Sequence, residues 1–297
     1  MEWNPTKYLE NSRMQFSIGE LAINKLNPQK SEAILDLGCG IGNLTACIAE
    51  RTTPGTVIGI DPDPNMIAYA NAMLKANPHP NLTFIQMDGI NIPFQKEFNA
   101  VFSNIVIHWI KPLQLLWEKI YNSLRPGGRI QIATIFDDSA PAQDANSKEN
   151  VTLEPKMKIS QIELPIMQNF MIKGHFTDIL SWEEFQAYQS QVNPNLTYKV
   201  YKIPELEEML KKAGFKDIRI DQQTFWHEFC DPEIYLEYRK SNLWLYFLGY
   251  FPEKFRPQLA EKLANLIREE WNNLPAGHKE LPIQEKWPIL FIHAKKW

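Results

Sequence analysis

The segment 34–45 constrains the fold more than any other part of this 297-residue chain. An apolar run ends at Asp36, and Gly38, Gly40 and Gly42 follow at alternate positions. This order predicts a buried strand, a tight turn and the first turn of a helix. Glycine allows positive φ angles and lets a ligand lie against bare backbone. The segment is therefore typical of α/β folds that bind nucleotides at the end of a strand.

The glycine spacing narrows the class of cofactor. Folds that bind dinucleotides use the pattern G-x-G-x-x-G, whereas the turn here reads G-x-G-x-G. With Asp36 two residues before Gly38, the segment resembles motif I of class I S-adenosylmethionine (SAM) methyltransferases. The resemblance implies that SAM is the cofactor. A dehydrogenase is the disfavoured alternative.

Composition excludes several kinds of partner. A hydrophobic content of 44% supports a sizeable core, and a net charge of −4 gives no basic footprint for nucleic acid. The three cysteines form no C-x-x-C pattern and fit a reducing compartment. No secretory signal begins the sequence, and no apolar stretch is long enough to span a membrane. We therefore expect a cytoplasmic monomer or homodimer that acts on a small molecule.

Strand and helix patterns alternate over 34–135, as a parallel sheet requires. The alternation returns over 203–220, and a last strand pattern lies near the end of the sequence. We expect an α/β fold with a Rossmann-like, mostly parallel sheet of seven strands, flanked by helices and interrupted by helical caps. The expected strands are 34–37, 56–60, 82–87, 100–107, 129–135, 218–220 and 287–293, and the expected helices are 44–51, 66–76, 113–124 and 203–213, with a further helical stretch over 232–274.

The expected domain organisation has one core and two caps. The SAM-binding core with an N-terminal substrate helix covers 1–136, a helical cap 137–200, the continued core 201–228, a second helical cap segment 229–283, and the last core strand 284–297. Aromatic side chains are frequent in the caps, which favours an apolar substrate. They include Phe170, Phe176, Trp182, Phe225, Trp226, Phe229, Tyr235, Trp244, Tyr246 and Phe247.

Acidic residues close three successive predicted strands. Asp36 lies beside the glycine turn, and Asp61 ends the second strand, where a carboxylate can accept hydrogen bonds from both ribose hydroxyls. Asp88 ends the third strand, where the acid or amide of the family meets the adenine amino group. The predicted cofactor-binding set is completed on this side by Pro62, Met66 and Gly89.

Four polar residues lie close together near the start of the sequence. Tyr8, Asn11, Ser12 and Gln15 are spaced at i, i+3, i+4 and i+7, which predicts one face of a single helix. We interpret this face as the polar lining of an active site, with a solvated first turn as the alternative. A second such segment, 103–110, ends the fourth predicted strand, where substrate and methyl donor are expected to meet.

These two segments resemble those of carboxyl methyltransferases. Residues 8–15 resemble the Y-x-x-N-S-x-x-Q start of plant enzymes of the salicylic acid type, and juvenile hormone acid methyltransferases share its Asn and Gln. Residues 106–109 resemble the apolar-His-Trp segment of these enzymes, and residues 3–9 resemble trans-aconitate methyltransferases. The resemblance implies that Gln15 and Trp109 hold the substrate carboxylate, with His108 beside it. It also implies that Tyr8, Asn11, Ser12, Gln15 and Asn104 line the SAM side.

The expected reaction is formation of the methyl ester of a small-molecule carboxylic acid. A carboxylate is ionised at neutral pH and needs no general base. The amide of Gln15 and the indole N–H of Trp109 can orient it as neutral donors. We found no ligand cluster for a metal and expect a metal-independent enzyme. The alternatives are an amine, phenol or carbon acceptor with His108 or Tyr8 as base, a malonyl-thioester acceptor, and a non-catalytic SAM-binding subunit.

Overall fold

The computed structural model describes residues 4–136, 201–239, 254, 256–273 and 283–297. The chain divides into two compact units. Of the described residues, the larger unit contains 4–136, 201–223 and 288–297, and the smaller contains the others. The expectations for the cap at 137–200, including Phe170, Phe176 and Trp182, lie outside the described residues, as do those for Trp244, Tyr246 and Phe247.

One sheet of seven strands forms the framework, and its strands are β1 (Ala33–Leu37), β2 (Thr56–Asp61), β3 (Leu82–Gln86), β4 (Phe98–Asn104), β5 (Leu124–Ile135), β6 (Lys216–Phe229) and β7 (Ile283–Lys295). Their order is β3-β2-β1-β4-β5-β7-β6. Neighbouring strands from β3 to β5 are parallel, and β7 is antiparallel to β5. The expected Rossmann-like, mostly parallel sheet is confirmed. Its strand order reverses between β1 and β4, and ligands bind at such a switch point, outside the carboxyl ends of the strands.

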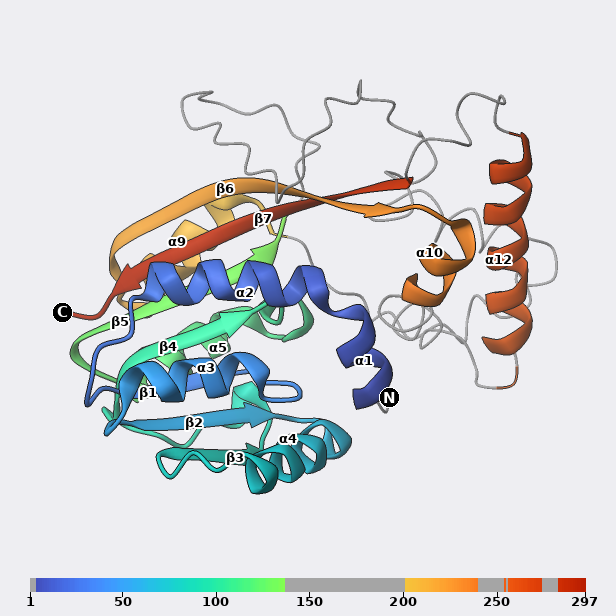
Figure 1. The fold of residues 1–297 in the computed structure, drawn as a ribbon. Coiled ribbons are helices and arrows are strands. Elements are labelled where there is room, and N and C mark those ends of the chain that lie inside the picture. The colour runs from blue at the N-terminus through green and yellow to red at the C-terminus, as the bar shows by residue number, and fades with distance from the viewer. Residues whose placement is uncertain (1–3, 137–200, 240–253, 255, 274–282) are drawn as a thin grey trace. The chain divides into compact units, whose positions relative to one another are not determined.

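The described helices are α1 (Pro5–Asn11), α2 (Arg13–Leu26), α3 (Asn43–Thr52), α4 (Pro64–Ala76), α5 (Leu113–Ser123), α9 (Ile203–Ala213), α10 (Pro232–Arg239) and α12 (Arg256–Asn273), with short 3-10 turns η1 (Gly89–Asn91) and η2 (Ile107–Trp109). In Figure 1, α2 and α3 lie in front of the sheet and α5 and α9 behind it. The sheet is thus covered on both faces, which explains why β1 and the middle of β4 are mostly apolar and why both strands are largely buried.

The core behind the sheet depends on aromatic packing between α5 and α9. Trp117 of α5 is fully buried, and its ring meets Phe215 edge-on at 6.5 Å between centroids. Phe215 reaches this place because α9 ends at Gly214, whose φ of +103° is favourable only for glycine. The predicted helix over 203–213 is confirmed, and Gly214 is its C-cap.

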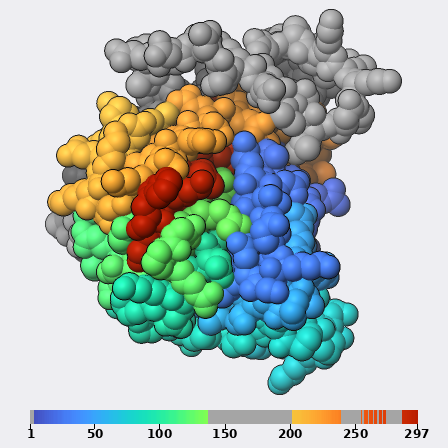
Figure 2. Space-filling model, turned by 90° about the vertical axis from the view of Figure 1, so that its left-hand side faces the viewer, coloured from blue at the N-terminus to red at the C-terminus, as the bar shows by residue number. Residues whose placement is uncertain are grey.

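The last strand joins the sheet from far along the sequence. Gln131 of β5 lies opposite His293 of β7 in an antiparallel register. Figure 2 shows β7 (red) between the green chain of the N-terminal half and the yellow to orange chain of α9 and β6. Just after β7, the ammonium of Lys296 donates to the carbonyl oxygens of Tyr121 and Leu124, at 2.7 and 2.8 Å. The carbonyl oxygen of Tyr121 also accepts the backbone N–H of Leu124, so Lys296 adds a second bond at the end of α5.

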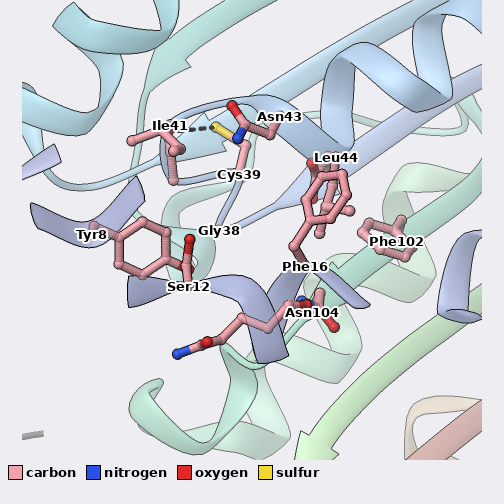
Figure 3. A pocket seen from close by; sticks show the side chains of 13 residues that line it. Tyr8, Ser12, Phe16, Gly38, Cys39, Ile41, Asn43, Leu44, Phe102 and Asn104 are labelled. Carbon is pink, nitrogen blue, oxygen red and sulfur yellow. Dashed lines mark hydrogen bonds between the residues drawn. The ribbon is translucent and has the colours of Figure 1, made fainter. Parts of the chain in front are cut away.

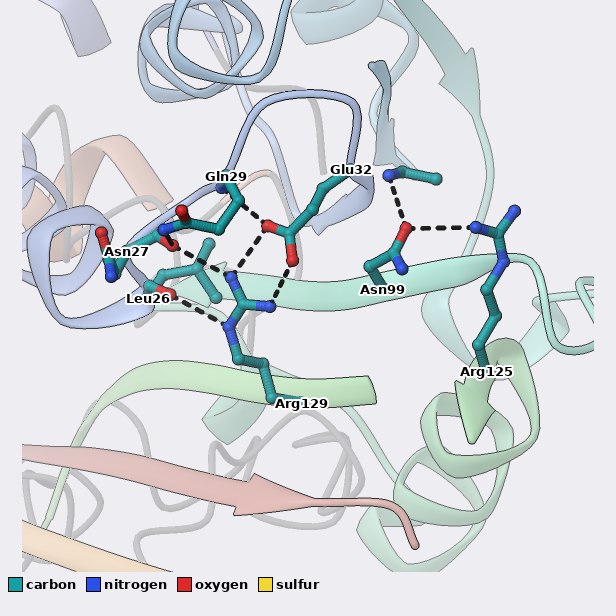
Figure 4. Close-up of polar contacts among 8 residues, drawn as sticks. Leu26, Asn27, Gln29, Glu32, Asn99, Arg125 and Arg129 are labelled. Atoms are coloured by element: carbon teal, nitrogen blue, oxygen red, sulfur yellow. Dashed lines mark hydrogen bonds and ion pairs between the residues drawn. The ribbon is translucent and has the colours of Figure 1, made fainter. Parts of the chain in front are cut away.

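An ion pair joins the end of α2 to the sheet (Figure 4). The guanidinium of Arg129 donates to both carboxylate oxygens of Glu32, at 2.6 and 2.9 Å, and to the carbonyl oxygens of Leu26 and Asn27. The side chains of Arg129 and Glu32 are only 18% and 14% exposed. Burial raises the pKa of Glu32, but hydrogen bonds from Arg129 and from the backbone N–H of Gln29 outweigh it and leave that pKa below its ordinary value.

We expect Glu32→Gln to lower the free energy of unfolding by about 1.5–3 kcal/mol, the usual value of hydrogen bonds to charged groups. Because the pKa of Glu32 is lowered by folding, its contribution is present above pH 4.5 and disappears as the pH falls through the folded-state value. Urea unfolding at pH 7 and pH 3.5 measures both effects. Glu207→Gln is the matched control, since its ion pair with Lys211 is exposed. Equal effects of the two substitutions would contradict the role of the Arg129 pair.

Candidate cofactor and active site

A pocket lies at the switch point of the sheet, beyond the carboxyl ends of β1 and β4. It is a partly open pocket with a cavity volume of about 50 Å³, and it lies where ligands usually bind in open α/β sheets. Figure 3 shows side chains of the first two helices facing the glycine turn and the start of α3 across it. The lining consists of Tyr8, Ser12, Gln15, Phe16, Asp36, Gly38, Cys39, Gly40, Ile41, Asn43, Leu44, Phe102 and Asn104.

The glycine turn supplies bare backbone to this pocket. Gly38 has a φ of +75°, and a Cβ there would overlap the side chain of Val106. Gly40 has a φ of +53° and no neighbouring atom within 4 Å of where its Cβ would be. Gly42 then forms the N-cap of α3. The turn thus needs glycine for its conformation at Gly38, and it leaves open space at Gly40 against which a ligand can lie.

The prediction of one helix carrying the opening polar residues is wrong. The chain forms α1 and α2 with a break at Ser12, whose φ and ψ are −99° and 19°. At the break, the side-chain amide of Asn11 donates to the carbonyl oxygen of Lys7 at 2.9 Å. Tyr8, Ser12 and Gln15 still line the pocket despite the break, whereas Asn11 does not.

The titratable groups of the pocket are all acids. Burial raises the pKa of Asp36 to about 7, aided by the charge of Asp61 and opposed by a hydrogen bond from Thr45. Burial and the charges of Asp61 and Asp36 raise the pKa of Tyr8 to about 12. The same causes raise the pKa of the Cys39 thiol well above its ordinary value. Since no Lys, Arg or His lines the pocket, its field favours a cationic ligand.

Two buried amide oxygens add to this acceptor character. The Oδ1 atom of Asn104 and the Oε1 atom of Gln15 are buried and have no hydrogen-bond partner. The orientation of the Asn104 amide is fixed, because its Nδ2 atom donates to the backbone carbonyl of Gln15 at 2.8 Å. These residues fit SAM, whose sulfonium and α-ammonium groups are positively charged and whose ammonium and hydroxyl groups donate hydrogen bonds.

Asp61 supports the glycine turn from the end of β2. Its Oδ2 atom accepts the backbone N–H of Gly40 at 3.0 Å, and its Oδ1 atom accepts that of Asp63 at 2.9 Å. Burial raises the pKa of Asp61, and these two hydrogen bonds oppose the shift. Asp61 is not among the residues lining the pocket, so its contact with the ribose stays a prediction. Pro62 and Met66, which begin the following segment and α4, have the same status.

The predicted adenine side is built around the turn after β3. The carboxylate of Asp88 accepts the backbone N–H of Ile90 at 3.1 Å and caps η1. Gly89 is buried, and a Cβ there would lie 2.8 Å from the side chain of Leu37 and 3.1 Å from that of Ile110. Asp88 and Gly89 do not line the pocket, so their adenine contacts also stay predictions.

The prediction that the fourth strand runs over 100–107 is wrong at its end. β4 stops at Asn104 because Ile105 has a φ of +57°, in the left-handed region that is strained for a β-branched residue. The chain then forms η2, which carries His108 and Trp109. Neither of them lines the pocket, although η2 begins only two residues after Ile105.

His108 is held firmly inside the protein. Its side chain is 2% exposed, and its Nδ1 atom lies 3.1 Å from the hydroxyl oxygen of Thr134 in β5. Its ring centroid lies 4.5 Å from that of Trp109, which is half-buried. Burial lowers the pKa of His108 to about 3, so its ring is neutral at physiological pH. The predicted substrate contacts of His108 and Trp109 stay predictions.

Six residues line the pocket that the sequence analysis did not name. Phe102 could have been found, because it precedes Asn104 by two positions in β4 and therefore faces the same side. Two others are the intervening residues of the G-x-G-x-G turn, and two open α3. The six are Phe16, Cys39, Ile41, Asn43, Leu44 and Phe102.

The sequence matches the family model for a methyltransferase domain over residues 34–128. The protein named "Putative methyltransferase 235L" of Invertebrate iridescent virus 6 is 32% identical over 213 residues, which cover 68% of this chain and 70% of that one. The chain belongs to the class I SAM-dependent methyltransferases, and SAM is its cofactor.

Two further similarities concern part of the sequence or the fold alone. The trans-aconitate 2-methyltransferase of Deinococcus radiodurans is 32% identical over 133 residues, which cover 44% of this chain and 49% of that enzyme. The chain thus spans about half the length of that relative. The YcgJ protein of Bacillus subtilis has the same fold, with a TM-score of 0.59 over 95% of this chain and 98% of its own, at 13% identity.

Two further properties concern the described residues alone. Within them, no helix is long and apolar enough to cross a membrane. The same residues contain no group of three or more His, Cys, Asp or Glu side chains that could hold a metal ion.

We expect Asp61→Ala to weaken SAM binding about ten- to a hundredfold. The substitution removes a charged acceptor from the predicted ribose contact and from the N–H of Gly40, each of which contributes. Calorimetric titration with SAM measures the affinity. Asp63→Asn is the control, because it changes a neighbouring carboxylate that caps α4, whereas Asp61 accepts the N–H of Gly40. Unchanged SAM affinity in Asp61→Ala would show that the ribose assignment is wrong.

Proposed function

We propose that this methyltransferase forms the methyl ester of a small, mostly apolar carboxylic acid. The observation that carries the proposal is the state of His108 and Tyr8, the two side chains that the rival reactions are predicted to use as a base. His108 is buried with a pKa of about 3, and Tyr8 has a pKa of about 12. At neutral pH the first binds protons too weakly and the second is not ionised, so neither is matched to base catalysis. An amine or phenol acceptor needs such a base, whereas a carboxylate does not.

The chemistry of ester formation explains the preference for neutral donors near the acceptor. SAM supplies, when bound, a methyl group on a positively charged sulfur. Charge on the acceptor oxygen falls during the transfer, so an Arg or Lys beside it would stabilise the ground state more than the transition state. Gln15 and Trp109 can donate hydrogen bonds without adding a full charge. Their role is orientation of the carboxylate, which supplies much of the rate in such reactions.

His108 acts, in this proposal, through Trp109. Its ring packs against the indole, and its bond to Thr134 attaches η2 to β5. A neutral, buried imidazole held in this way fixes the position of its neighbour without taking part in proton transfer. The predicted contact of His108 with the substrate stays a prediction beside this supporting role.

One relative and the aromatic content of two segments indicate which kind of acceptor is methylated. The relative from Deinococcus radiodurans is named for trans-aconitate, a carboxylic acid, which supports a carboxylate acceptor. The aromatic residues of the segments 137–200 and 229–283 favour an acid with an apolar body. Methylation of an amine, phenol or carbon is the rival that the experiments below separate.

We expect methyl ester products with carboxylic acids and none with matched phenols or amines. With saturating SAM, kcat should stay flat from about pH 6 to 8.5, because the carboxylate is ionised throughout and no base titrates in the reaction. Mass spectrometry identifies the ester, which alkali hydrolyses. A rate that rises with pH through a single ionisation, with a product stable to alkali, would favour the rival acceptors.

We expect Trp109→Phe and Gln15→Ala each to lower kcat/KM for the acid about ten- to a thousandfold, since orientation is lost with the hydrogen bond. The two effects should be less than additive because both residues orient one group. SAM affinity should change little in Trp109→Phe. Trp297→Phe is the matched control, because that tryptophan is 71% exposed. Full activity of Trp109→Phe on the preferred acid would remove the main support for the proposed clamp.

A further inference from the structure

The hydroxyl of Thr45 makes a buried hydrogen bond to Asp36, a residue that lines the cofactor pocket. Thr45 lies in the first turn of α3, is 0% exposed, and donates to the Oδ2 atom of Asp36 at 2.7 Å. Asp36 is itself 2% exposed and lines the pocket. Among the described residues, no other side chain or backbone group donates a hydrogen bond to this carboxylate.

The surroundings of Asp36 disfavour its ionised form. The charge of Asp61, at the end of β2, raises the pKa of Asp36, and the charge of Asp36 in turn raises the pKa of Cys39 in the glycine turn and of Tyr8 in α1. All of them are acids, and the pocket is lined by no basic side chain. Burial in such a place raises the pKa of Asp36 to about 7. The hydrogen bond from Thr45 is the one interaction here that stabilises the carboxylate before a ligand arrives.

We propose that Thr45 is a positioning residue, whose hydroxyl keeps the Asp36 carboxylate ionised and oriented for the positively charged cofactor. A cation binds the ionised form of Asp36 better than the protonated form, so cofactor affinity depends on the fraction ionised. Thr45 raises that fraction near neutral pH, and its bond also fixes the direction of one carboxylate oxygen. The inference concerns the cofactor alone and does not depend on which acceptor is methylated.

The test is the pH profile of cofactor affinity, measured by calorimetry between pH 5.5 and 9. S-adenosylhomocysteine serves as the stable probe, with SAM as a check near pH 7. In the unmodified protein, affinity should fall by up to about tenfold per pH unit below about pH 7. In Thr45→Val the midpoint should move up by about one to two pH units, the size expected for loss of a hydrogen bond to a charged group. Affinity at pH 7 should then fall about five- to fiftyfold, and the deficit should shrink by pH 9.

Three further variants make the outcome decisive. Thr45→Ser keeps the hydroxyl and should restore the unmodified profile, and Asp36→Asn should bind weakly with no dependence on pH. Thr52→Val is the matched control, since Thr52 is a fully buried threonine of the same helix whose hydroxyl donates to the carbonyl of Ile48. Comparison of all proteins at each pH cancels the titration of the ligand's own ammonium group.

The contrary results are equally distinct. An unshifted midpoint in Thr45→Val overturns the proposal, as does a deficit of the same size at every pH, which would indicate a purely steric role. Unmodified affinity in Asp36→Asn overturns it as well. If Thr45→Val does not fold, Thr45→Ala and Thr45→Ser are compared in the same way, and equal midpoints overturn the proposal.

Discussion

The tie between the glycine turn and the end of β2 is the constraint on which the site depends. The backbone N–H groups of Gly38 and Cys39 both donate to the carbonyl oxygen of Ile60, at 2.8 and 3.0 Å, and that of Gly40 donates to Asp61. The turn therefore cannot move independently of the neighbouring strand. Because α3 begins directly after the turn, its first residues are placed by the same bonds. The pocket is rigid where the cofactor must be recognised, as productive binding requires.

The acidic character of this pocket has a cost for the protein without ligand. The raised pKa of Asp36 means that folding is penalised most above about pH 7, where its buried carboxylate is ionised, and that the penalty disappears as the pH falls toward the ordinary value of 3.8. The unpartnered oxygen of Asn104 adds a further cost of desolvation. A cation with several donors relieves both. Ligand binding and stability are thus coupled through the same atoms.

Much of this site could be predicted because its determinants are local in the sequence. A strand that ends in an acid before three alternate glycines is typical of a cofactor-binding turn. Asp36, Gly38 and Gly40 do line one pocket. The break at Ser12 could not be predicted in the same way, because a helical stripe from Tyr8 to Gln15 is equally compatible with an unbroken helix. No proline or glycine between Tyr8 and Gln15 marks the break.

The end of β4 was harder still to predict. Residues 105–107 are apolar and β-branched, so their pattern continues the strand, and only the left-handed turn at Ile105 stops it. That conformation depends on tertiary contacts, including the packing of Val106 where Gly38 lacks a side chain. The burial of His108 follows from the same turn. A histidine that follows a predicted strand looks reactive, but its reactivity is set by the strand it faces, which the local sequence does not reveal.

The two halves of the proposed active site differ in charge. The cofactor side has acidic groups and the acceptor side has neutral donors, and the reaction explains why. On the cofactor side a cation must be drawn from water, so ionised carboxylates such as Asp36 are useful even though their burial is costly. On the acceptor side both reactants lose charge as the methyl group moves, so a fixed cation there would oppose the transfer. Neutral donors such as Gln15 avoid this opposition. Gln15 also lines the cofactor pocket, so in this proposal its amide lies between the acidic cofactor side and the neutral acceptor side.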